Sequence, residues 1–143
     1  MALKRKLKTF LGKSGAERRM ICEAILMLAG ARIIVLTVPF RFQAKWLERA
    51  PDGQGAADTA LVARVRRAVT TAARNVPWNA VCLPQALAAK AMLARRGQGS
   101  AFHLGATFDQ NGKLIAHAWL ECRGEIVTGA AGIRGMSHLV RFG

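Results

Sequence analysis

The hydrophobic pattern changes its period once along the chain, near residue 97, and this change predicts the fold class. Within residues 57–74 the apolar positions recur every three to four residues, as on one side of a helix: Leu61, Val65, Ala68, Val69 and Ala72. After Gly97 the pattern alternates with a period of two, and the expected strands cover residues 100–108, 113–122 and 125–128. The Asn111-Gly112 pair marks a hairpin turn. We therefore expect an α+β protein with helices first and a small antiparallel sheet after them.

Proline and glycine divide the helical part of the chain. Helices are expected at 17–36, at 43–49, at 57–74 and from Leu83 to about Gly97, after a basic leader at 1–15. Residues 51–56 begin Pro-Asp-Gly-Gln-Gly, with turn formers at nearly every position, and are expected to form a linker. The linker would separate a basic N-terminal segment with an apolar helix, 1–50, from a core domain, 57–143.

The charge of the chain favours an acidic partner. Its 22 lysines and arginines outnumber 8 acidic residues and give 143 residues a net charge of +14. Nucleic acid, anionic lipid and an acidic peptide or protein are all compatible with such a surface. The apolar stretch 20–40 contains Glu23, Arg32 and Pro39, so we expect a buried or interface-facing helix rather than a membrane span.

The cysteines indicate neither a metal site nor a disulfide framework. The three lie at positions 22, 82 and 122 with no CxxC spacing, so we expect no metal and no cofactor. A reducing cytoplasm is the simplest compartment for such a chain. Cys22, in the apolar helix, and Cys122, at a hairpin edge, are interpreted as structural.

Cys82 and His117 are the residues most typical of catalytic chemistry. Cys82 lies at the predicted start of a helix, where unpaired N–H groups and the helix dipole favour a thiolate. His117 lies on a predicted strand and is expected to take the thiol proton and return it to a leaving amine. The Cys82 N–H, with the Asn79 amide as a second donor, would stabilise an oxyanion. His103 and His138 are weaker candidates.

Several motifs together resemble one family. They are Pro77-Trp78, Cys82-Leu83-Pro84-Gln85-Ala86-Leu87, Arg95-Arg96-Gly97, Leu104-Gly105 and Ala116-His117-Ala118-Trp119-Leu120-Glu121. These segments resemble the stand-alone leader peptidases of lasso peptide biosynthesis, which are transglutaminase-like cysteine proteases. The resemblance covers roughly residues 57–130 and implies a papain-like or transglutaminase-like α+β core, with the nucleophile at a helix start packed on an antiparallel sheet.

The resemblance also implies a task and partners. The task is removal of the leader from a ribosomally made precursor peptide, after which a cyclase related to asparagine synthetase closes the macrolactam with ATP. ATP is then used by the cyclase and not by this chain. A small separate protein would hold the leader, because this chain shows no recognition domain. An anionic membrane surface is a further candidate partner, and no specific nucleic acid is expected.

One position departs from the family. An aspartate about twelve residues after the histidine usually orients the imidazole, and residue 129 is a glycine here. A two-residue turn at Arg123-Gly124 would pair Cys122 with Glu125 and bring Thr128 and Gly129 close to His117. Glu121 points to the same side as His117 but farther along the strand. The third member of the site is therefore Thr128, Glu121 or a backbone carbonyl, or is absent.

Two other classes of function remain open at this stage. A transglutaminase or amidase would use the same Cys-His pair with another acceptor. A non-enzymatic basic module would bind nucleic acid or an anionic membrane through the net charge of +14.

Overall fold

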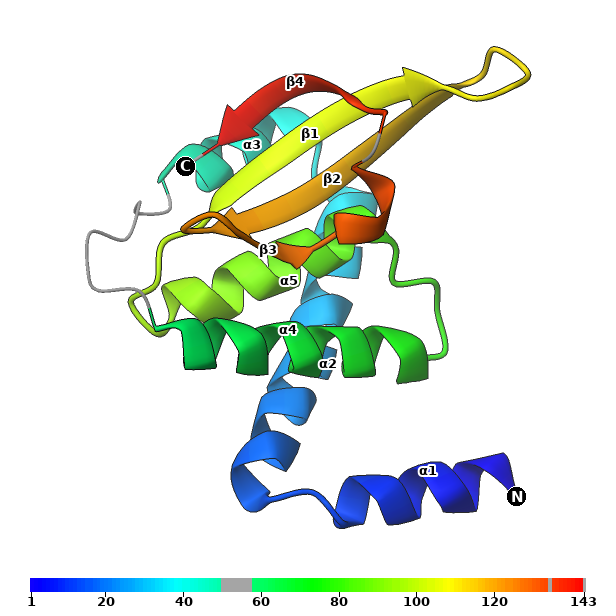
Figure 1. Cartoon of the computed structure of the whole chain (residues 1–143), viewed down its shortest axis with the longest axis vertical. Coiled ribbons are helices and arrows are strands. Elements are labelled where there is room, and N and C mark those ends of the chain that lie inside the picture. Colours follow the sequence, from blue (N-terminus) through cyan, green and yellow to red (C-terminus); the bar gives the residue numbers. More distant parts are fainter. Residues whose placement is uncertain (50–57, 134, 143) are drawn as a thin grey trace.

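The computed structural model describes residues 1–49, 58–133 and 135–142 (Figure 1). Its helices are α1 (Ala2–Leu11), α2 (Gly15–Thr37), α3 (Phe40–Arg49), α4 (Thr59–Asn75) and α5 (Cys82–Ala94). Its strands are β1 (Ala101–Phe108), β2 (Leu114–Cys122), β3 (Glu125–Thr128) and β4 (Ser137–Phe142), with a short 3-10 turn, η1, at Ala130–Gly132. The expected α+β class is confirmed. The linker expected at 51–56 lies outside the described residues.

The helices pack as a layer beneath one antiparallel sheet. Helices α4 and α5 both contact the sheet through β3, and α5 also packs on β2. Helix α2 crosses the other side of α4 and α5, and α1 projects away from this body (Figure 1). Asp58 begins α4 by accepting a hydrogen bond from the Leu61 N–H at 2.9 Å. Helix α5 ends shortly before Gly97. This glycine has φ +72°, the left-handed geometry expected of a glycine that follows a helix.

The sheet contains a strand that the sequence pattern did not predict. Its order is β3-β2-β1-β4, so β4 pairs with β1 at the edge far from β3. No strand is expected from the sequence after residue 128, and β4 lies beyond that point. The register on β1 shifts between Leu104 and Gly105, and β4 exposes Leu139 while it buries Phe142. This irregularity breaks the simple alternation that would have indicated a strand.

One hydrophobic core joins both expected domains. Residues of α2 and α3 belong to the same buried cluster as α4, α5 and the sheet; they are Ile21, Ala24, Leu28, Ala31 and Leu47. The expected division between 1–50 and 57–143 therefore cuts through a continuous core. In the described part of the chain α2 alone has the length and apolar composition to cross a membrane, and 28% of its most apolar window is buried in the protein.

An ion-pair cluster fixes α2 to the end of α5. The Glu23 carboxylate accepts hydrogen bonds from the guanidinium groups of Arg95 at 2.8 Å and Arg96 at 2.9 Å. The Glu23 side chain is 16% exposed, so solvent screens this cluster only in part. The hydrogen bond from Arg96, together with the two positive charges, holds the pKa of the Glu23 carboxyl below its ordinary value of 4.5, against the opposing effect of burial.

Replacing Glu23 by glutamine should lower the free energy of unfolding at neutral pH by about 1–3 kcal/mol. Because the native pKa is depressed, the stabilisation from ionised Glu23 is present above the unfolded-state pKa and is lost as pH falls through the native value. Urea denaturation of wild type and Glu23→Gln from pH 7 to about pH 3 should show the difference shrinking with acid. Glu48→Gln, at an exposed glutamate of α3, is the control and should have little effect.

Candidate active site

Cys82 is the first residue of α5. The preceding residue, Val81, is extended and its side chain does not cap the helix. The approach to the helix is held by Gln85, whose Nε2 donates to the Ala80 carbonyl at 2.6 Å. N–H groups in the first turn of a helix have no intrahelical acceptor, and Pro84 occupies that turn without needing one. The Cys82 thiol is partly exposed at a helix end whose first N–H groups have no intrahelical acceptor, an arrangement suited to binding an oxyanion.

His117 lies on β2 with a defined orientation. Its Nε2 is 2.7 Å from the carbonyl oxygen of Gly129. Because a carbonyl only accepts hydrogen bonds, Nε2 must carry the proton. In the neutral ring Nδ1 is then left with the lone pair and is the basic nitrogen. The carbonyl of Gly129 therefore performs the orienting task that a carboxylate performs in other sites.

Two glycines shape the space around the His117 ring. Gly129 has φ +80°, and a Cβ there would lie 2.6 Å from the Ala118 carbonyl oxygen and 3.1 Å from His117 Nε2. A Cβ on Gly132 would lie 2.5 Å from two atoms of the ring. Residues 129–132 thus wrap the imidazole closely and leave no space for an aspartate side chain at 129.

Neither Thr128 nor Glu121, the side chains expected as alternatives for orienting His117, is hydrogen-bonded to it in the described structure. Cys122 pairs with Glu125 as expected, but the register then shifts, and Thr128 lies opposite Leu120. The Thr128 side chain is buried, and its hydroxyl has no hydrogen-bond partner among the described residues. The Glu121 carboxylate is 3.4 Å from His103 Nε2 instead. Of the expected options, the structure therefore shows the backbone carbonyl hydrogen-bonded to His117.

Cys82 and His117 lie on elements that pack against each other, but no hydrogen bond joins their side chains in the described structure. Helix α5 packs on β2, and Cys82 contacts the core beneath the sheet. The His117 and Trp119 rings stack, with 6.2 Å between their centroids. Ala118, between them in the sequence, belongs to the core, so His117 and Trp119 lie on the opposite face of β2. Proton transfer requires hydrogen-bond distance, and such distances often shorten only when substrate binds. Catalysis by this pair requires a movement that brings Nδ1 to the sulfur.

The loop before α5 carries further donors. Asn79, the expected second oxyanion donor, is exposed, and no hydrogen bond to its side chain is present in the described residues. Trp78, just ahead of the cysteine, carries a further donor that the sequence pattern does not single out. Its indole Nε1 is buried without an acceptor among the described residues, although its ring packs on the core. The signal available in the sequence was the Pro77-Trp78 pair just ahead of the cysteine.

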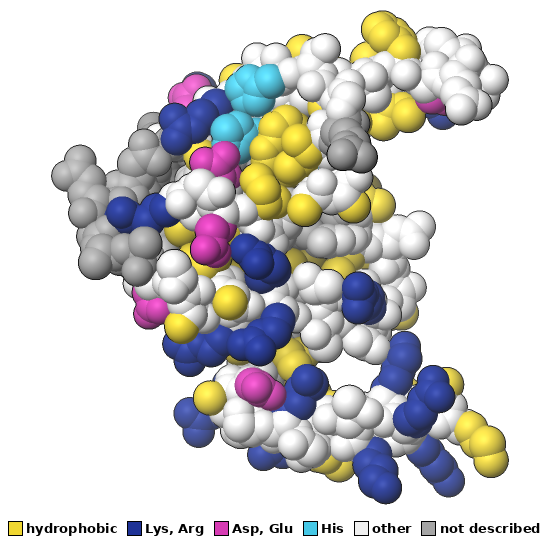
Figure 2. All heavy atoms as spheres, viewed as in Figure 1, with side chains coloured by type: hydrophobic (Ala, Val, Ile, Leu, Met, Phe, Trp, Pro, Cys, Tyr) yellow, Lys and Arg dark blue, Asp and Glu magenta, His cyan; other side chains and the backbone are white. Residues whose placement is uncertain are grey.

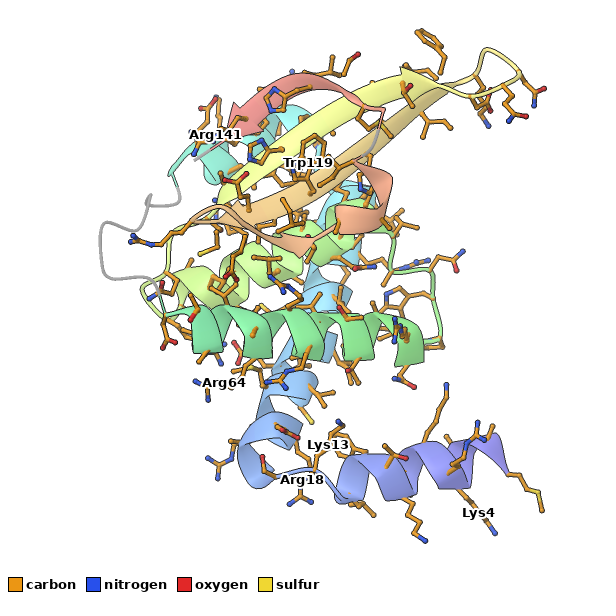
Figure 3. The ribbon with its side chains drawn as sticks, viewed as in Figure 1. Lys4, Lys13, Arg18, Arg64, Trp119 and Arg141 are labelled. Carbon is orange, nitrogen blue, oxygen red and sulfur yellow. The ribbon has the colours of Figure 1, made fainter. Side chains whose placement is uncertain are left out.

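A second group of histidines lies on the same face of the sheet as His117. The His103 ring stacks on Trp119, with 5.3 Å between centroids, and its Nδ1 is 3.0 Å from His138 Nε2 on β4 (Figure 3, where Trp119 is labelled). Figure 2 shows histidine side chains next to acidic and hydrophobic ones on this side of the molecule. Burial lowers the pKa of His103, which outweighs the opposing effect of Glu121. The His103 ring packs on one side of Trp119, and Trp119 also stacks on His117.

No metal site is evident in the described ranges, since no three histidine, cysteine, aspartate or glutamate side chains converge there. Cys122 is buried, and its thiol donates to the Gly99 carbonyl at 3.2 Å. Burial raises the pKa of this thiol. A thiol with a raised pKa is a poor nucleophile, which agrees with its interpretation as structural.

Comparison with known families gives one match. The model of the transglutaminase-like superfamily matches residues 25–141, which include all the residues considered above for catalysis. The match begins within α2, in agreement with the continuous core. Searches of curated proteins and of solved structures found no significant match.

Proposed function

The chain belongs to the transglutaminase-like superfamily, and on that premise we propose that it is a cysteine endopeptidase with Cys82 as nucleophile and His117 as base and acid. Membership indicates cysteine peptidase or acyltransferase chemistry. The observation that carries the proposal is the hydrogen bond from His117 Nε2 to the Gly129 carbonyl, which leaves Nδ1 to accept a proton.

The proposed reaction proceeds through an acyl-enzyme. A movement first brings His117 to hydrogen-bond distance of Cys82. Nδ1 of His117 then takes the thiol proton, and the thiolate attacks the scissile carbonyl carbon. The Cys82 N–H stabilises the resulting oxyanion. The C–N bond breaks as the imidazolium returns its proton to the leaving amine, which leaves a thioester. Water, deprotonated by Nδ1, then attacks the thioester and releases the carboxylate product and the free thiol.

We further propose that the substrate is the leader–core junction of a lasso precursor peptide. The support is the pairing of the Cys82-Leu83-Pro84 and Ala116-His117-Ala118-Trp119 motifs, which resemble those of stand-alone leader peptidases. A separate leader-recognition protein and an ATP-dependent cyclase are the proposed partners, and the cytoplasm is the proposed compartment. Macrolactam closure by the cyclase would consume the new amine.

Mass spectrometry tests this proposal. A candidate precursor is incubated with this chain, with and without a leader-recognition protein. Peptidase action should give two fragments whose summed mass exceeds that of the precursor by one water. Acyl transfer to another amine, the alternative chemistry of the superfamily, gives instead a crosslinked product that has lost ammonia. An intact precursor under every combination of components contradicts the substrate assignment.

A further inference from the structure

Helix α1 carries an uncovered row of leucines. Leu3, Leu7 and Leu11 are spaced four residues apart, so they lie along one side of the helix. Their side chains are 79%, 55% and 58% exposed, and α1 has no buried residue. Figure 1 shows α1 extending away from the sheet and the other helices. A row of this kind has no partner in the described part of the chain.

The rest of α1 and the turn after it are strongly basic. Residues 1–16 contain no acidic residue, and their cations are Lys4, Arg5, Lys6, Lys8 and Lys13. The basic positions flank the leucine row on both sides when the sequence is placed on a helix. Figure 2 shows lysine and arginine side chains gathered over α1 and along α4, and Figure 3 shows Lys4 pointing away from the body of the protein.

Helix α1 is joined to the protein in a defined way. Phe10, near its C-terminal end, packs against the hydrophobic core. The Gly12 N–H donates to the Lys8 carbonyl at 3.0 Å and closes the helix, and Ser14 then begins α2 by accepting from the Glu17 N–H at 3.2 Å. The packing of Phe10 thus holds the C-terminal end of α1 against the protein, while the side chains of Leu3 and Leu7 remain exposed to solvent.

We propose that α1 binds the surface of an anionic bilayer, with Leu3, Leu7 and Leu11 in the interface and the lysines and arginine on the lipid phosphates. A short amphipathic helix with a basic polar side is the form that interfacial anchors take. Anionic headgroups attract the cations, and the acyl boundary accepts the leucines. Nucleic acid would use the cations alone and would leave the leucine row in water. The bilayer is the partner that accounts for both features.

Vesicle flotation tests the proposal with the full chain. Wild type should bind vesicles of phosphatidylcholine with about one-third phosphatidylglycerol and bind phosphatidylcholine alone at least about tenfold more weakly. Leu3→Glu combined with Leu7→Glu should reduce binding to the anionic vesicles at least about tenfold, since it removes the apolar contact. Replacing Lys4, Lys6 and Lys8 by glutamine should reduce it by a similar factor.

Leu139→Glu on β4 is the matched control, because Leu139 is 61% exposed and lies far from α1 in the sequence. Its binding should equal that of wild type. If the α1 leucine variant binds as well as wild type, adhesion is due to net charge alone and the proposal is overturned. An equal loss with Leu139→Glu overturns it too. Neither outcome depends on peptide cleavage, so the proposed peptidase activity is judged separately.

Discussion

Replacing Cys82 by alanine should lower cleavage of the precursor by at least about a thousandfold, because no other thiol in the described structure occupies a helix start. Cys22→Ala is the matched control. Cys22 is exposed on α2, contrary to its interpretation as a structural residue, so this variant removes an exposed thiol without touching the site, and its activity should equal that of wild type. The measurement is the initial rate of fragment formation by mass spectrometry.

Alkylation adds a test that does not need the natural substrate. Iodoacetamide should modify Cys82 faster than Cys22 at neutral pH if Cys82 is the nucleophile, because the first residue of α5 lies beside N–H groups that have no intrahelical acceptor. Peptide mapping of the modified chain reports both rates. Equal rates for the two cysteines, together with full activity of Cys82→Ala, would exclude Cys82 as the nucleophile.

Replacing Gly129 by alanine should lower the free energy of unfolding by about 2–5 kcal/mol. Two effects add. The left-handed backbone at φ +80° is unfavourable for alanine, and the new Cβ would press on the Ala118 carbonyl oxygen at 2.6 Å. Relief of that contact has to move the Gly129 carbonyl, which is the hydrogen-bond partner of His117, so activity should fall as well. Urea denaturation and the cleavage rate measure the two losses.

Gly135→Ala separates the two effects. Gly135 has φ +79°, close to that of Gly129, but open space surrounds the position of its Cβ. This control should cost only about 1–2 kcal/mol, from the backbone alone. If both variants lose the same stability and keep full activity, the close packing of residues 129–132 around His117 has no functional importance.

The sequence predicted the elements that obey a regular period. Helix α4 and strand β3 lie within two residues of their expected bounds, because Pro77, the Arg123-Gly124 turn and the change of period mark them clearly. The sequence predicts no single conformation for the basic leader at 1–15, and most of it forms α1. Strand β4 was missed, since its pairing with β1 is irregular and depends on a partner distant in the sequence.

The surroundings of His117 could be predicted only in part. The hairpin register correctly placed Gly129 near the ring. The bulge beyond Glu121 could not be read from the residues, and it turns the Gly129 carbonyl, rather than the Thr128 side chain, toward Nε2. The stack of His103 on Trp119 also depends on the pairing of β1 with β2. The alternation of apolar and polar residues predicts which face of the sheet a side chain occupies. Its neighbours on the adjacent strands depend on the register of pairing, which the alternation does not give.

The route of the chain from β3 to β4 leaves one edge of the sheet uncovered until the last strand docks. After η1 the chain leaves one edge of the sheet and joins the other, and on the way Met136 passes close to Gly105 of β1. Pairings between distant segments form late in folding, because the intervening loop must first be closed. Until β4 docks, β1 is an open edge prone to self-association. Docking of β4 on β1 therefore protects this edge of the sheet against self-association.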